Sequence, residues 1–152
     1  MSSRTDLLKQ AEIYCARQER CTRDVEEKLR AWDARQDDIP AILESLRKGG
    51  FLNEERYAAS FARGEFRTNK WGRMKIRYAL AARGIPGEII GRALETIDPD
   101  EYREQAEELI RRKLSEIKRE KKLNIRSKIY NFAYGKGYES GLILDILKEL
   151  KI

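Results

Sequence analysis

The chain has 152 residues, of which 41% are hydrophobic and 38% are charged, and its formal net charge at pH 7 is +6. It contains no histidine and neither a GxxxxGKS/T loop nor a GxGxxG turn, which excludes Ser-His-Asp and Cys-His catalysis, imidazole metal sites and the common nucleotide-binding loops. We therefore expect a binding protein rather than an enzyme, without catalytic residues, cofactor, metal or small-molecule substrate.

The first third of the chain is predicted to form three helices from the helical spacing of its apolar residues. The first covers about 5–19, and the second runs from an N-cap at Thr22 to about Trp32. The third begins near Asp38 and ends at Gly49-Gly50.

The same spacing predicts six more helices. In the middle third, Asn53 caps one helix, a second covers about 70–83, and a third starts at Ile85-Pro86. We expect Gly72 to lie inside the second of these, with Trp71 and Tyr78 on its apolar side. In the last third, a long helix opens at Asp98-Pro99 and runs to about Lys121, followed by helices over about 125–134 and 139–150.

These helices form an internal repeat. Shifting the sequence by 53 residues aligns Lys75-Ile76 with Lys128-Ile129, and Leu94 with Leu147. Shifting it by 47 residues aligns Lys28-Leu29 with Lys75-Ile76. Because Leu, Ala, Glu, Lys and Arg dominate the composition and valine occurs only once, we predict an all-α fold. Three tandem three-helix repeats, over 1–52, 53–97 and 98–152, should form an elongated, curved array.

The positive charge is concentrated in the middle of the chain. Residues 61–92 carry eight basic and two acidic groups, a local charge of +6. Such an excess suits an acidic partner surface or nucleic acid. The predicted partner-binding residues are Arg63, Arg67, Lys70, Arg73, Lys75, Arg77 and Arg83. A second basic stretch, over 111–128, has two explanations: a contact surface, or a solvated helix face whose charges suit the helix dipole.

The remaining features indicate an intracellular protein. Cys15 and Cys21 match no metal-binding spacing, so we expect free thiols, buried or half-buried, in a reducing compartment. No apolar run is long enough to span a bilayer, and the first ten residues lack the apolar stretch of a secretory signal. We expect a cytoplasmic location.

Two stretches carry a family resemblance. The sequence GFLNEERYA over 50–58 and the sequence WGRMKIR over 71–77 resemble the centre of the RecX family, while residues 21–29 and Lys136-Gly137-Tyr138 resemble its first and last repeats. The resemblance covers about 8–150 and implies three tandem three-helix repeats. It also implies a partner, the RecA recombinase: RecX proteins lie in the groove of the RecA filament on DNA and restrain ATP hydrolysis and strand exchange.

Two other functions stay open from the sequence. One is a sequence-nonspecific DNA-binding helical module that contacts phosphates through 61–92. The other is a helical-repeat scaffold that binds only proteins. If the basic residues contact the filament, reversing the charges of Arg67, Lys70 and Arg73 together should weaken binding and leave the melting temperature nearly unchanged.

Overall fold

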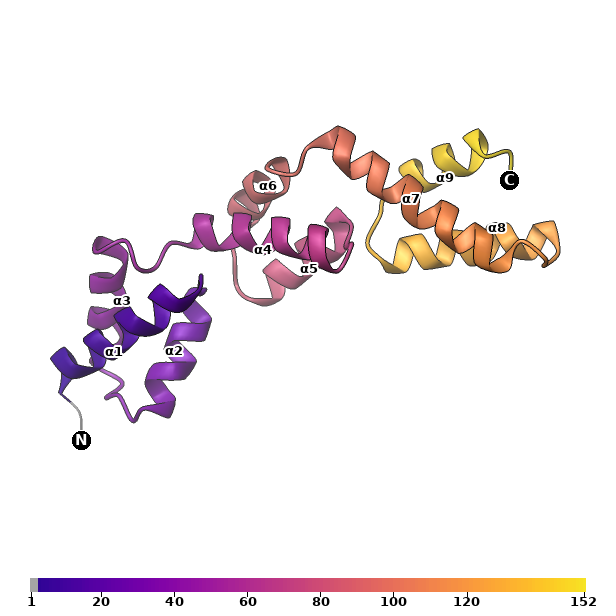
Figure 1. Ribbon diagram of the computed structural model, residues 1–152. Helices are drawn as coiled ribbons and strands as arrows, with labels where there is room; N and C mark the ends of the chain where they lie inside the picture. Colours follow the sequence, from indigo (N-terminus) through magenta and orange to yellow (C-terminus); the bar gives the residue numbers. More distant parts are fainter. Residues whose placement is uncertain (1–2) are drawn as a thin grey trace.

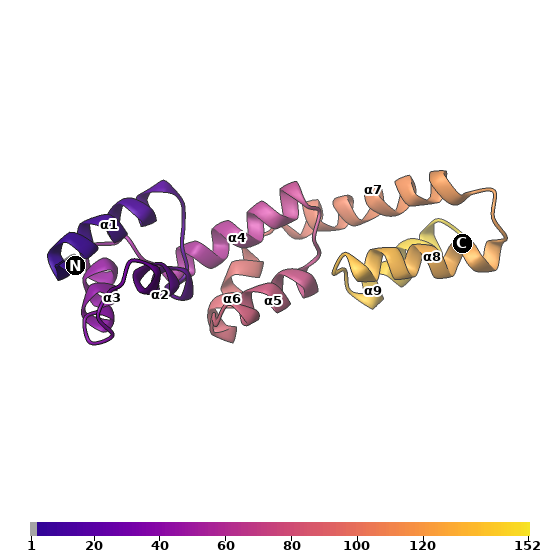
Figure 2. The same cartoon turned by 90° about the horizontal axis from the view of Figure 1, so that it is seen from below.

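The structure is a computed structural model that describes residues 3–152, which are helical apart from turns and connections. The helices are α1 (Arg4–Arg17), α2 (Thr22–Ala31), α3 (Ile39–Lys48), α4 (Glu54–Thr68), α5 (Arg73–Ala82), α6 (Gly87–Glu95), α7 (Pro99–Ile117), α8 (Lys122–Gly135) and α9 (Ser140–Glu149). They follow one another along an elongated molecule, with α1–α3 at one end and α7–α9 at the other (Figures 1 and 2). The predicted all-α, elongated array of three-helix repeats is confirmed.

The helices group in threes. The main packing partners are α1 with α3, α4 with α6, and α7 with α8. We call α1–α3 the N-terminal unit, α4–α6 the middle unit and α7–α9 the C-terminal unit. The proposed repeat boundaries, at 52/53 and 97/98, fall in the connections between α3 and α4 and between α6 and α7.

Most predicted helix starts agree with the structure. The Asn53 side chain accepts a hydrogen bond from the Arg56 N–H at 3.0 Å, and Asp98 accepts one from the Glu101 N–H at 2.9 Å. These are the first-turn donors that an N-cap satisfies. The prediction for Thr22 is wrong, because the helix already includes it and Cys21 is the N-cap. The predicted first and seventh helices are too long, and α8 begins three residues earlier than expected.

The start of α5 differs most from prediction. Lys70 has a φ of 61°, a left-handed conformation that separates α5 from α4, and Gly72 is the N-cap of α5 rather than a residue inside it. The prediction that Tyr78 faces the core is also wrong, since its side chain is 79% exposed. Trp71 is half-buried and packs against the core, with its ring edge-on to Phe61 at 6.3 Å.

The apolar side chains form two cores. One belongs to the N-terminal unit, while the other runs without interruption through the middle and C-terminal units. The residues aligned by the repeat are buried in both cores: Leu29, Ile76 and Ile129 have no exposed surface, and Leu94 and Leu147 are buried at the same place in α6 and α9. None of the helices in residues 3–152 has the length and apolar character that crossing a bilayer requires.

The N-terminal and middle units are joined mainly by polar contacts at the surface. The Arg23 guanidinium donates to the carbonyl of Ala82, and Arg56 pairs with Glu19. The apolar part of this junction is small: Cys21 is the one residue of the described N-terminal unit that belongs to the larger core. Cys15 and Cys21 are buried free thiols, as predicted, and burial raises the pKa of each.

Candidate functional site

The seven predicted partner-binding residues lie on α4, on α5 and in the turns that flank α5. The structure does not gather them into one uninterrupted patch. It divides them into an inward-facing residue, a pair beside the acidic part of α7, and four residues elsewhere on the middle unit. Their role in binding a partner stays a prediction, but their surroundings differ sharply.

Arg73 is the inward-facing residue. Its guanidinium forms a 2.9 Å ion pair with Glu139, and its Cζ lies 3.9 Å from the centre of the Tyr102 ring. Tyr102 in turn donates its hydroxyl proton to Glu139 and accepts the backbone N–H of Arg73 at 2.9 Å. Arg73 therefore holds the middle unit to the C-terminal unit, and a charge reversal here would place two carboxylates together. The expectation that reversing the charges of Arg67, Lys70 and Arg73 leaves the melting temperature unchanged is therefore wrong, because the change at Arg73 should destabilise the protein.

Arg67 and Lys70 lie beside the acidic part of α7. Both line a shallow hollow of about 260 Å³ that Glu101, Glu104 and Glu108 line from the other side. These carboxylates partly neutralise the two cations, because opposite charges on two sides of one hollow attract each other even without direct contact. The local charge of +6 counted over residues 61–92 is therefore partly offset by the carboxylates of α7 on this side of the middle unit.

The other four residues are Arg63, Lys75, Arg77 and Arg83. Lys75 lies over the Trp71 ring, with its Nζ 4.7 Å from the ring centre, and Arg83 lies over Phe61 at the same distance. Arg77 is exposed and Arg63 is half-buried. Within residues 3–152 no carboxylate pairs with Lys75 or Arg77 at 4 Å or less, whereas Arg73 and Arg92 have such partners. Lys75 and Arg77 are the basic residues of α5 best placed to receive an anionic partner.

The position of α5 is fixed by a close backbone contact with the end of α8. The N–H groups of Gly72 and Met74 donate to the carbonyls of Lys136 and Gly137, at 2.8 and 2.9 Å. The N-terminus of one helix thus meets the C-terminus of another, and each supplies the groups that the other leaves unpaired. A Cβ at Gly72 would lie 2.3 Å from the carbonyl carbon of Gly137, so only glycine allows this approach.

Buried tyrosines reinforce the same junction. The Tyr138 hydroxyl donates to the carbonyl of Lys70 and accepts from the side-chain amide of Gln105, both at 2.9 Å. Gln105 also donates to the carbonyl of Phe66 at 2.9 Å. The Tyr102 ring packs between Phe66 and Tyr138, with centroid distances of 5.9 and 5.2 Å. The polar partners Gln105 and Glu139 are not among the residues predicted from the sequence.

Buried tyrosines of the larger core make the stability of the protein depend on pH in the alkaline range. Burial raises the pKa of Tyr57 and of Tyr138 from 10.0 to about 12. Between these values the unfolded chain loses phenolic protons that the folded chain keeps, so the free energy of unfolding should fall as pH rises from about 10 to 12. Tyr138→Phe should reduce this slope by close to one proton in urea titrations at stepped pH. Tyr78→Phe, at an exposed position, is the control, and an unchanged slope for Tyr138→Phe would contradict the assignment.

The second basic stretch, over 111–128, is largely a charged helix surface. Lys128 pairs with Glu120, and Lys113 pairs with Glu116 at 3.8 Å while also lying over Phe132. Arg112 pairs with Glu108 at 3.5 Å. Several basic side chains of this stretch therefore pair with nearby carboxylates, which favours the explanation that they belong to a solvated helix face. Among the described residues, no group of three or more Cys, Asp or Glu is arranged to hold a metal ion.

Comparison with known proteins gives a consistent result. Residues 53–94 match the family model described as RecX, second three-helix domain, and residues 100–147 match RecX, third three-helix domain. The regulatory protein RecX of Clostridium acetobutylicum is 33% identical over 132 residues, which are 84% of this chain and 61% of that protein. Its counterpart in Clostridium botulinum, strain Eklund 17B, is 30% identical over 129 residues, covering 84% of this chain and 60% of the relative. The chain thus spans about three fifths of the length of these curated relatives.

Solved structures agree over nearly the whole chain. The crystal structure of RecX from Lactobacillus salivarius superposes with a TM-score of 0.89 at 26% identity, covering 97% of this chain and 96% of that one. A second crystal structure, of a regulatory protein RecX, gives 0.84 at 25% identity, covering 95% and 73%. The two family models together match more than half of the sequence. The chain belongs to the RecX family of regulatory proteins.

Proposed function

We propose that this protein binds RecA filaments on DNA and restrains their ATP hydrolysis and strand exchange. It acts by binding, without a catalytic step of its own, and it acts in the cytoplasm, where RecA assembles on DNA. The proposal is supported by membership of a regulatory family and by the shape of the chain. A row of three units offers a long surface, which suits a partner built from repeating subunits.

The observation that carries the proposal is the exposed basic part of α5. Lys75 and Arg77 project from a helix that the backbone contact with α8 holds rigidly in place. A rigidly held helix loses little backbone freedom on meeting an anionic partner. It also accelerates association with a negatively charged nucleoprotein.

The proposal is tested by DNA-dependent ATP hydrolysis with the RecA of the same organism. Adding the purified protein should lower the steady-state rate in a concentration-dependent manner. Binding to RecA-coated DNA at physiological salt should exceed binding to naked duplex. Equal binding to naked duplex would favour the sequence-nonspecific DNA-binding module instead, and an unchanged rate with no filament binding would refute the proposal.

The double substitution Lys75→Glu and Arg77→Glu should weaken filament binding about tenfold or more and make the remaining affinity less dependent on salt, because fewer counterions are exchanged. The unfolding free energy should change by no more than about 1 kcal/mol, since both side chains are exposed and the substitution removes only the contact of Lys75 with Trp71. Affinity is measured at several salt concentrations. The charge-matched control, Arg35→Glu with Lys48→Glu in the N-terminal unit, should bind like the parent. Equal loss in both variants would show that only net charge matters.

A further inference from the structure

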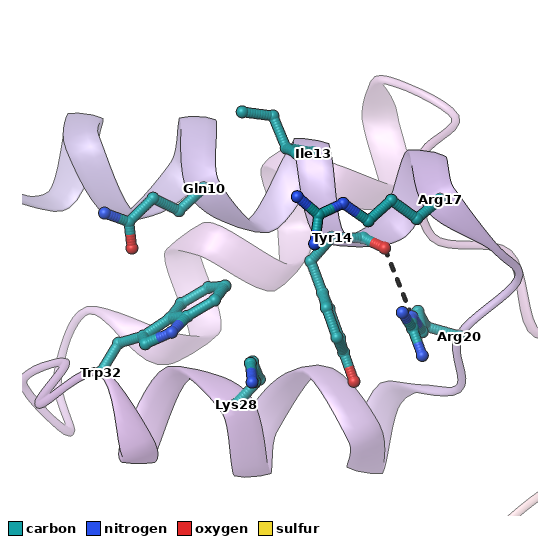
Figure 3. Close-up of a pocket in the computed structure, with 7 residues that line it drawn as sticks. All are labelled: Gln10, Ile13, Tyr14, Arg17, Arg20, Lys28 and Trp32. Atoms are coloured by element: carbon teal, nitrogen blue, oxygen red, sulfur yellow. Dashed lines mark hydrogen bonds between the residues drawn. The ribbon is translucent and has the colours of Figure 1, made fainter.

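A pocket of about 540 Å³ opens between α1 and α2 of the N-terminal unit, away from the basic surface of α5. Its walls come from the second half of α1 and from Arg20, which lies in the connection between α1 and α2. Lys28 on α2 and Trp32 just after the end of α2 complete them. Figure 3 shows Tyr14 near the middle of the pocket, with Trp32 on one side and Arg20 on the other. We call it the N-terminal pocket.

Its charged lining is purely positive. Arg17, Arg20 and Lys28 line the pocket, and no Asp or Glu does. Within residues 3–152 none of these three forms an ion pair, whereas Arg30 and Arg47 of the same unit do. The nearby carboxylates are engaged elsewhere: Asp24 accepts the N–H of Cys21 at 3.3 Å, and Glu19 pairs with Arg56. The pocket thus presents three cations without anionic partners.

Its apolar lining is unusually accessible. Ile13 is 57% exposed at the rim, and Tyr14 and Trp32 are half-buried, with ring centres 6.1 Å apart at 80°. Lys28 Nζ lies 5.6 Å from the centres of both rings. Trp32 can therefore shield an inserted apolar side chain, with Ile13 at the rim and the cations at its edges.

The arrangement disfavours stacking of a nucleic-acid base on Tyr14. Arg20 covers one face of Tyr14, with its Cζ 3.9 Å from the ring centre, and its Nε donates to the Tyr14 carbonyl at 3.3 Å. The other side of the ring meets Trp32 (Figure 3). A stacking platform needs an open ring face, and Tyr14 offers none.

The pocket is also particular to its unit. The 47-residue shift that aligns the first two repeats keeps Lys28 as Lys75 but replaces Trp32 by Ala79, Arg17 by Gly64 and Ile13 by Ser60. Ile13, Arg17 and Trp32 are therefore not part of the pattern that the first two repeats share. Their joint presence needs another explanation.

We propose that the N-terminal pocket binds an acidic peptide segment that carries one bulky apolar side chain. The apolar side chain lies against Trp32, with Ile13 at the rim, and neighbouring carboxylates reach Arg17, Lys28 and the free edge of Arg20. Charge complementarity selects the acidic segment, and burial of the apolar residue supplies the larger part of the affinity. This site is separate from the α5 surface and does not depend on the proposed function.

The test uses a short fluorescein-labelled peptide of Asp and Glu with one central Phe, titrated with the full chain and followed by anisotropy. A Trp71→Phe background leaves Trp32 as the single tryptophan, so a change in its fluorescence on binding places the peptide in the pocket. Replacing the peptide's Phe by Ala should weaken binding about tenfold or more, as expected when a buried aromatic side chain is lost. RecA is absent from this assay, so failure here is distinct from failure of filament binding.

The double variant Arg17→Ala with Lys28→Ala should bind the Phe peptide about tenfold more weakly, because charge-assisted contacts are lost. The matched control, Arg35→Ala with Lys48→Ala, removes the same charge from exposed positions in the same unit and should bind like the parent. Circular dichroism verifies that both variants fold. The proposal is overturned by equal affinity for the Phe and Ala peptides, by equal loss in both variants, or by oligothymidylate binding more tightly than the peptide and displacing it.

Discussion

Replacing Gly72 with alanine should destabilise the protein by about 3 kcal/mol. The added Cβ would lie 2.3 Å from the carbonyl carbon of Gly137, 2.4 Å from its oxygen and 2.5 Å from the nitrogen of Tyr138. All three are backbone atoms, which cannot rotate away as the end of a side chain can. Relief requires α5 to separate from α8, which also breaks the hydrogen bonds that Gly72 and Met74 donate.

The measurement is the free energy of unfolding from urea denaturation, with Gly64→Ala as the matched control. Gly64 is a glycine inside α4, and a Cβ added there would have no neighbouring atom within 4 Å outside its own helix backbone. Alanine there should stabilise the protein by about 0.4–1 kcal/mol, because it reduces the freedom of the unfolded chain. If Gly72→Ala behaves like Gly64→Ala, the contact between α5 and α8 does not exist in solution.

Leu94→Ala should cost about 2–5 kcal/mol, the range for truncating a buried leucine. Leu94 is 5% exposed and lies on α6, the helix that packs most closely on α4. The internal repeat aligns it with Leu147, which is fully buried on α9. The substitution therefore tests whether the repeat alignment identifies the core positions of each unit.

The control for this substitution is Leu144→Ala. Leu144 lies on α9 but is 43% exposed, so its truncation should change the unfolding free energy by about 0.5 kcal/mol or less. Comparing urea denaturation of the two variants separates a core effect from the general effect of losing a leucine side chain. A loss below about 0.5 kcal/mol for Leu94→Ala would mean that the alignment does not mark buried positions.

Local signals in the sequence predicted most of the fold. The N-cap at Asn53, the helix start at Asp98-Pro99 and the apolar spacing that predicted α3 and α6 depend on residues a few positions apart, and these predictions agree with the structure. The repeat also pointed correctly to Leu94 and Leu147. The family resemblance marked Gly72 and Gly137 as motif residues, but it gave no sign that they touch.

What escaped prediction depends on residues far apart in the chain. Gly72 looked like an interior helix residue because its partner, the end of α8, lies more than sixty positions away. Arg73 looked like a free surface charge because Glu139 is equally distant. Charge counted along the sequence could not reveal that Glu101, Glu104 and Glu108 face Arg67 and Lys70. The N-terminal pocket was missed for another reason. The position of Tyr14 in the sequence fits the buried stripe of a helix, and the sequence does not show that Tyr14 is only half-buried or that Ile13 beside it is exposed.

The two junctions of the array differ in stiffness. Between the middle and C-terminal units, backbone hydrogen bonds, a continuous core and stacked tyrosines leave little room for bending. Between the N-terminal and middle units, the contacts are mostly exposed polar ones, among them the pair of Arg56 with Glu19. The molecule therefore resembles a rigid bar with a hinged end. The junction between the N-terminal and middle units would then adapt to the curvature of a partner's surface. The rigid pair of middle and C-terminal units would fix the spacing of the contacts that they make.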